Sequence, residues 1–242
     1  MKTIQISLLI WSILLSTSIC GQEISFGVQA GYGSYKMASL HNLSESLAAP
    51  LPSDDVIISD YPSNLYFQAE ADLAFIDNKF SIGIAASVNS TGSRVHYSDY
   101  SGSYRFDALL SDYTIGSIFK ARLFRVSKID IKAYSEFGFS STTLTIDEYF
   151  QIDSEINERR QTYDSSPAYL EPGLRANYRF GAFSLGINAG YSINIGDTFT
   201  IIGNEIVILA NPYTRETIVA DWSGLRLGIM ATFRVFTLKD KK

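Results

Sequence analysis

The stretch AYLEPGLRANYRF, residues 168–180, alternates between two kinds of side chain. One set of alternate positions is apolar, and the other holds Glu171, Arg175 and Arg179. Successive side chains of a β-strand point to opposite faces, so this period of two predicts a strand with one apolar and one charged face. The location of the charged face therefore decides the fold.

Seven further segments repeat this period, each roughly the length of a membrane-crossing strand. Their charged residues all fall on the same face as their glycines and small polar residues, and the opposite face is apolar. The expected strands are 23–35, 64–76, 80–91, 112–124, 129–141, 168–180, 183–195 and 223–236.

The links between these segments alternate in length. Short links are expected at 77–79, 125–128 and 181–182, and long loops at 36–63, 92–111, 144–166 and 196–221. Short turns on one rim and long loops on the other are typical of outer-membrane barrels. We therefore predict an all-β fold: an eight-stranded antiparallel up-and-down transmembrane β-barrel with periplasmic turns, extracellular loops and both termini in the periplasm.

Glycine indicates which face points inward. Glycine weakens a strand, but a narrow eight-stranded barrel has room inside only for small residues between long ones. The glycine-bearing polar face is therefore expected inside and the apolar face against lipid, rather than in the core of a soluble ligand-binding barrel or sandwich. Two aromatic girdles follow, Phe75, Phe80, Phe180, Phe183 and Phe233 near the short turns, and Tyr32, Phe67, Tyr113, Phe139 and Tyr191 nearer the loops.

The inward face carries acids and bases that can pair across the lumen and offset their desolvation. Eight strands enclose no wide channel, so a plugged lumen is expected rather than a pore. The predicted lumen charge network comprises Glu70, Asp72, Lys120, Arg122, Lys132, Glu136, Glu171, Arg175, Arg179, Arg226 and Arg234, with Asp130 on the same face. Pro172, which cannot donate to a ladder, predicts a local bulge.

The first 21 residues predict an export signal, because Lys2 precedes the apolar run ISLLIWSILL and a small-residue exit. The predicted organisation is a signal peptide over 1–21 and a barrel domain over 22–242. Cys20 is the only cysteine. Lipidation of Cys20 stays open only as a minor alternative, because that processing prefers a small residue just before the cysteine and Ile19 is bulky.

The opening EISFGVQAGYG, the strand YLEPGLRANYRF and the closing GLRLGIMATFRVF together resemble the small outer-membrane β-barrel domain proteins common in Bacteroidota. This resemblance spans nearly all of residues 22–242. It implies insertion by the outer-membrane assembly machinery, which recognises an aromatic-rich last strand, although here TLKDKK follows Phe236. The family mostly lacks an assigned activity.

The four long loops, with the first residue of the fourth strand counted in, hold 17 acidic and 6 basic residues. This acidic rim argues against nucleic-acid binding, which needs clustered Lys and Arg, and it leaves contact with lipopolysaccharide through divalent cations open.

The glycines of GYGSYK are interpreted as part of a strand and not as a nucleotide-binding motif, because no helix is expected after them. The segment DEYFQIDSEINERRQTYD predicts strands extended above the membrane. We expect no cofactor, no metal site and no catalytic residues.

The expected role is structural or surface interaction by a monomer among outer-membrane lipids and lipopolysaccharide, with an extracellular partner that the sequence does not identify. One alternative is a narrow channel for small solutes. A second is an outer-membrane lipid hydrolase, because His96 and Ser98 match the His-x-Ser spacing of lipid A deacylases. The two-residue match is short, and the rest of that family's pattern is absent.

Overall fold

The computed structural model describes residues 23–51, 57–75, 79–100, 102–153 and 155–237. The predicted signal peptide, Cys20 and residues 238–242 of the tail lie outside this part of the chain. Within the described residues, no helix has the length and apolar character needed to cross a membrane.

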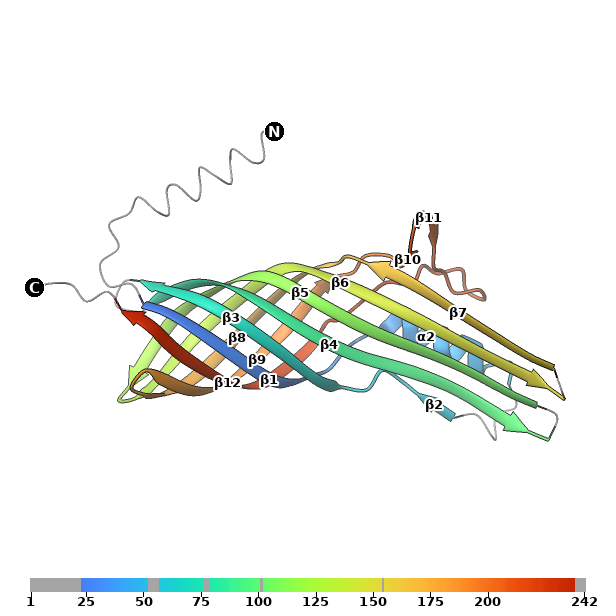
Figure 1. Ribbon diagram of the computed structural model, residues 1–242, viewed down its shortest axis with the longest axis horizontal. Helices are drawn as coiled ribbons and strands as arrows, with labels where there is room; N and C mark the ends of the chain where they lie inside the picture. The colour runs from blue at the N-terminus through green and yellow to red at the C-terminus, as the bar shows by residue number, and fades with distance from the viewer. Residues whose placement is uncertain (1–22, 52–56, 76–78, 101, 154, 238–242) are drawn as a thin grey trace, which may run out of the picture.

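Eight antiparallel strands form a closed ring (Figure 1). Each strand pairs with the next along the chain, and the last pairs back with the first from Glu23↔Thr237 to Gly33↔Arg226. No edge of the ring is left unpaired, as a barrel requires. In ring order the strands are β1 (Glu23–Gly33), β3 (Asn64–Phe75), β4 (Phe80–Asp99), β5 (Gly102–Val126), β6 (Ile129–Ile152), β8 (Ala168–Phe180), β9 (Phe183–Ile195) and β12 (Gly224–Thr237).

The eight-stranded antiparallel barrel predicted from periodicity is therefore confirmed, with most strand ends within a few residues of expectation. Two-residue turns at Ser127–Lys128 and Gly181–Ala182 join strands at one end. Gly181 has φ +68°, a left-handed conformation that glycine adopts without steric cost. Figure 1 shows the start of β1 and the end of β12 together at this end.

Alternate side chains separate into an exposed outer face and a buried lumen. On β12, Ile229 is 68% exposed and the adjacent Met230 is 1% exposed. The outer face is apolar around the ring, and nine of the ten predicted girdle aromatics are exposed; the exception is half-buried Phe75. Phe75 and Phe80 stack at the end that carries the short turns, with ring centroids 6.3 Å apart. The apolar outer face and the polar interior follow the alternation of the sequence.

Two of the four expected loops are instead long hairpins, which corrects the prediction for 92–111 and 144–166. The sheet continues beyond the ring through β4, β5 and β6, and β7 (Glu155–Ser165) pairs with the distal part of β6. These segments keep the period of two, with Phe106, Ala108 and Leu110 buried on one face. The extension predicted from the mixed segment after Ile146 is present and runs far past the ring (Figure 1).

The expected loop 36–63 contains a helix that the sequence analysis missed. Helix α2 (Ala38–Ala48) begins directly after GYGSYK, so the expectation that no helix follows that segment is wrong. Gly31 and Gly33 nevertheless belong to β1. Short strands β2 (Ile57–Ser59), β10 (Thr200–Ile201) and β11 (Asn204–Ile208) complete the fold.

The bulge predicted at Pro172 is also wrong. The register between β6 and β8 runs through Pro172 without a shift. The ladder from β8 to β9 omits Glu171 and Pro172 and resumes in the same register, from Leu170↔Ile193 to Gly173↔Gly190. An interruption of two residues on one side thus accommodates a residue that has no N–H.

Candidate functional site

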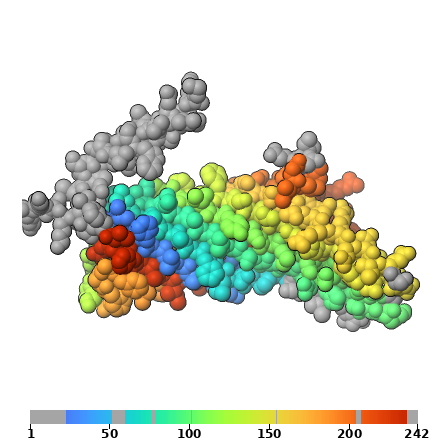
Figure 2. All heavy atoms as spheres, in the orientation of Figure 1, coloured from blue at the N-terminus to red at the C-terminus, as the bar shows by residue number. Residues whose placement is uncertain are grey.

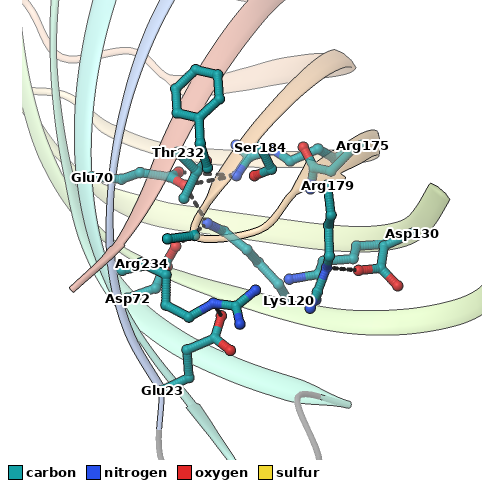
Figure 3. Close-up of a pocket in the computed structure, with 15 residues that line it drawn as sticks. Glu23, Glu70, Asp72, Lys120, Asp130, Arg175, Arg179, Ser184, Thr232 and Arg234 are labelled. Carbon is teal, nitrogen blue, oxygen red and sulfur yellow. Dashed lines mark hydrogen bonds and ion pairs between the residues drawn. The ribbon is translucent and has the colours of Figure 1, made fainter. Parts of the chain in front are cut away.

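The lumen near the short turns is filled by a buried cluster of charges (Figure 3). Lys120 on β5 donates to Glu70 Oε1 at 2.5 Å and to Asp72 Oδ2 at 2.6 Å, both on β3. Arg175 on β8 reaches Glu70 Oε1 from across the lumen at 2.8 Å. All four side chains are buried. Their alternating charges and short contacts offset the desolvation that each would otherwise suffer.

A second cluster surrounds Asp130, which is fully buried on β6 close to the turn rim. Arg125 pairs with it at 2.5 Å, Arg179 at 2.5 Å and Arg122 at 3.9 Å. Nearby, Arg234 Nε lies 3.0 Å from Glu23 Oε1. At the end of the barrel that carries the short turns, the Asp130 cluster thus links β5, β6 and β8, and the Arg234–Glu23 pair links β12 and β1.

The opposite part of the lumen relies on tyrosine and amide groups around two carboxylates. Tyr169 donates to Glu136 Oε1 at 2.6 Å, and Gln68 donates to its other oxygen at 2.8 Å. Tyr134 donates to Glu171 Oε1 at 2.9 Å, and Arg226 Nε lies 3.5 Å from Glu171 Oε2. Both carboxylates are buried and multiply satisfied. They therefore hold strands together across the lumen.

Of the eleven predicted network residues, ten contact a partner of opposite charge or a hydrogen-bonding group in these clusters. Lys132 is the exception: no ion pair of Lys132 is found in the described residues. In the sheet register it lies between Arg122 and Arg175. The network is thus three neighbouring groups rather than one, and Lys132 adds positive charge beside the first.

Sequence reasoning did not predict that three tyrosines pack over glycines inside the lumen. A Cβ atom added at Gly31, Gly173 or Gly116 would collide with the ring or hydroxyl of Tyr66, Tyr134 or Tyr169, respectively. Each of these glycines therefore makes room for an aromatic ring that packs over it: Tyr66 and Tyr134 are direct cross-strand neighbours of Gly31 and Gly173, and Tyr169 lies two strands from Gly116. All three tyrosines lie at inward positions of their strands, so strand parity was the signal that could have found them.

The plug leaves little free volume. The larger cavity, beside the Lys120 cluster, measures about 50 Å³, and a second beside Trp222 about 10 Å³. A site for one water needs roughly 10–15 Å³ by this kind of measure, so the cavities hold a few waters at most. Lys120, Glu70 and Arg175 are among the residues that line the first cavity, and Glu136, Tyr169 and Trp222 are among those that line the second.

Asp112, the first residue of the expected strand 112–124, lies within β5 in the lumen, where the barrel meets the projecting sheet. It accepts hydrogen bonds from Thr142 at 2.8 Å and Asn89 at 3.1 Å. Arg226 donates to Asn89, and the Trp222 indole donates to Thr142 at 3.0 Å. This chain of bonds connects the polar lumen to the apolar core above it.

That apolar core stands on the concave face of the projecting sheet. Helix α2 contributes Leu40 and Leu43, the sheet contributes Val95, Phe106 and Leu144 among others, and the segment before β12 adds Phe199, Ile218 and Trp222. Burial, with a smaller contribution from Glu148, raises the pKa of Tyr104 at its margin to about 12. We call this unit the cap, because it covers the loop end of the barrel.

The convex face of the projecting sheet carries several charged side chains. Arg94 on β4 makes a two-pronged contact with Asp107 on β5, at 2.5 and 3.0 Å. The Arg105 guanidinium lies 5.5 Å from the centre of the Tyr149 ring. Arg160 on β7 lies 3.4 Å from Asp147 on β6. These cross-strand contacts stabilise the sheet outside the ring.

The two histidines lie in the projecting region. His41 on α2 contacts Asp60 through Nδ1 and Glu45 through Nε2, the latter at 3.1 Å. His96 and Ser98 share the convex face of β4, where His96 is opposite Arg105. No hydrogen bond joins His96 to Ser98 in the described part of the chain.

No protein-family model matches the chain, and no curated protein matches it. Among solved structures, it is similar to a major outer membrane protein from Thermus thermophilus, with 14% identity, a TM-score of 0.48, and coverage of 88% of this chain and 99% of the other. It is also similar to Ail, the attachment invasion locus protein of Yersinia pestis, with 13% identity, a TM-score of 0.37, and coverage of 90% and 99%. The outer membrane protease OmpT from Escherichia coli shows 9% identity, a TM-score of 0.37, and coverage of 91% and 98%.

Proposed function

We propose that this chain is an outer-membrane protein that conducts no solutes and presents a rigid protein surface outside the cell. The observation that carries the proposal is the combination of a plugged ring with a long sheet that continues past it. The ring supplies a closed apolar belt for lipid, and the sheet keeps its own core under helix α2. The barrel acts as the anchor, and the projecting sheet is the part available to partners.

The apolar belt supports the membrane location. Outward Ile, Leu, Val and Phe side chains are exposed on every strand of the ring. A contiguous apolar surface of this extent is far larger than monomeric soluble proteins expose, whereas bilayer-spanning barrels require one. We infer a monomer with the short turns in the periplasm and the sheet outside, beside lipopolysaccharide and after insertion by the assembly machinery.

Fractionation tests the location. The protein should extract from outer membranes only with detergent, and it should migrate faster in gels when unheated than when boiled. Recovery in the aqueous fraction without detergent would overturn the proposal and favour a soluble barrel.

Planar bilayer recordings test the plug. Inserted protein should show no stable single-channel steps, because buried pairs such as Lys120–Glu70 and Arg175–Glu70 obstruct the lumen. Reproducible steps would instead support a narrow channel.

The lipid hydrolase alternative predicts that expression of the protein changes lipid A acylation and that His96→Ala abolishes the change. We expect mass spectrometry to show the same lipid A acylation in cells that express the wild-type protein and in cells that express His96→Ala.

A further inference from the structure

The outer edge of β7 is uncovered. On one side β7 pairs with β6 along its whole length, but on the other side it pairs with β10 only at Tyr163 and Asp164. Within the described parts of the chain, no strand pairs with residues 155–162 on that side. Their side chains are exposed from Glu155 to Arg160. Backbone groups along such an edge can pair with another strand.

This edge lies at the far end of the molecule from the short turns. Figure 2 shows the yellow atoms of the β6–β7 hairpin on the surface of the projecting region, remote from the ring. β7 runs along the long axis of the molecule (Figure 1). A strand added here would approach from outside the membrane and would not meet lipid.

The charges on this edge are complementary to those of a second copy in an antiparallel register centred on Arg159. When a two-fold axis relates two identical antiparallel strands, the same face of each strand lies on the same side of the joined sheet. Residues that are directly opposite each other must then lie on the same face, so their residue numbers add up to an even number. A pairing centred on Arg159 uses residues 156–162, which end where β10 takes the edge. It places Glu158 opposite Arg160 of the second copy, and Arg160 opposite its Glu158.

A pairing centred on Asn157 opposes Glu155 to Arg159 of the second copy, but it uses only residues 155–159 and is shorter. Shifting the centre from Arg159 by one residue in either direction opposes Glu158 to Glu158, or Arg160 to Arg160, of the second copy. Parallel in-register pairing opposes every charge to itself, and like charges directly opposite each other destabilise a sheet. The favoured register does oppose Arg159 to Arg159, but Glu148 on β6 is the cross-strand neighbour of Arg159 on that face.

Antiparallel pairing also determines how the two barrels are arranged. Because β7 runs along the long axis, an antiparallel copy points its barrel in the opposite direction, so both barrels cannot occupy one membrane. We propose that the partner of the projecting sheet is a second copy in a facing outer membrane, joined through the β7 edges. This inference rests on the proposed function, and it names the partner class: the same chain on a neighbouring cell.

Charge reversal on the full chain provides the test. Wild-type protein is inserted into phospholipid vesicles, and vesicle clustering is followed by turbidity against protein density. Glu158→Arg and Arg160→Glu each turn two attractive contacts into repulsive ones, so each alone should need about tenfold more protein for clustering. A mixture of Glu158→Arg vesicles with Arg160→Glu vesicles should cluster like wild type, because each copy then opposes the other with opposite charges. The double reversal should also cluster with itself.

Arg94→Glu is the matched control, since it reverses an exposed convex-face arginine on β4, away from this edge, and it should cluster like wild type. The proposal would be overturned if wild-type vesicles stayed dispersed, or if the single variants clustered as well as wild type. It would also be overturned if the mixture of the two variants clustered no better than either variant alone. Clustering with protein-free vesicles would also overturn it, in favour of a lipid partner. Heat-dependent gel migration of each preparation shows whether the barrel has inserted, so a failure of insertion is distinguishable from a failure of pairing.

Discussion

Glu70 is the side chain on which the lumen plug depends most, and Glu70→Gln tests this directly. The carboxylate receives Lys120 at 2.5 Å and Arg175 at 2.8 Å, with its side chain 1% exposed. The amide of Gln removes the negative charge and leaves Arg175 without its anion, whereas Lys120 keeps Asp72. Removing one partner of a buried pair costs about 3–5 kcal/mol, so we expect the free energy of unfolding to fall by that amount.

The assay is urea unfolding of detergent-solubilised protein. In a chain that begins at Gln22, Trp222 is the only tryptophan and reports on the cap through its fluorescence. Unheated gel migration reports on the barrel in the same samples. Arg94→Gln serves as control, because the Arg94 side chain is 57% exposed and Asp107 keeps a contact with Arg105 at 3.4 Å. Loss of such an exposed charge costs less than about 1 kcal/mol.

A double variant separates charge pairing from loss of shape. Combining Glu70→Gln with Arg175→Met removes the stranded cation together with its anion. We expect the double variant to lose less than the sum of the two single variants, with a coupling of about 1–3 kcal/mol. Additive losses, or a Glu70→Gln loss no greater than that of Arg94→Gln, would refute the view that buried pairing stabilises the plug.

Three further predictions concern other parts of the molecule. Gly138→Val should destabilise the barrel by about 1–3 kcal/mol in the same unfolding assay, because a new Cβ would collide with the Ile115 carbonyl on the neighbouring strand. Leu40→Ala should cost about 2–5 kcal/mol in the cap alone, since Leu40 is fully buried there; limited trypsin digestion should then release fragments of the projecting sheet while the ring stays intact. The pKa of the Tyr104 phenol is raised from 10.0 to about 12 in the folded cap. Below pH 10 the phenol is neutral in both the folded and the unfolded cap, and its contribution to the free energy of unfolding is lost as the pH rises from 10 towards 12. In an absorbance titration, Tyr104→Phe should lack one phenolate that wild-type protein forms near pH 12.

The ring was predictable because its strands satisfy a local rule. Each outward residue must be apolar and each inward residue must fit a narrow polar lumen, so Leu170, Glu171 and their neighbours reveal the strand without reference to any other segment. The same rule located the charged residues of the lumen. It did not reveal which charges meet, because Lys120 finds Glu70 fifty positions away only after eight strands have closed with a particular stagger.

The cap was not predictable in the same way. The outer part of β7 shows no alternation of buried and exposed positions, because residues 155–160 are all exposed. Helix α2 has no capping side chain at Met37, so a common signal of a helix start is missing. Its apolar residues are buried only because the projecting sheet lies beneath them.

The alternating pattern by itself determined a transmembrane-type ring, its inward and outward faces and the end at which the short turns lie, since the faces of a pleated strand follow from local order alone. Tertiary structure decided how the interior closes. Tyr66, Tyr134 and Tyr169 fill part of the lumen because glycines on nearby strands leave space for their rings. The three charges of AYLEPGLRANYRF are separated in the same way: Glu171, Arg175 and Arg179 share one strand face, yet each belongs to a different cluster because its partners come from strands distant in the sequence.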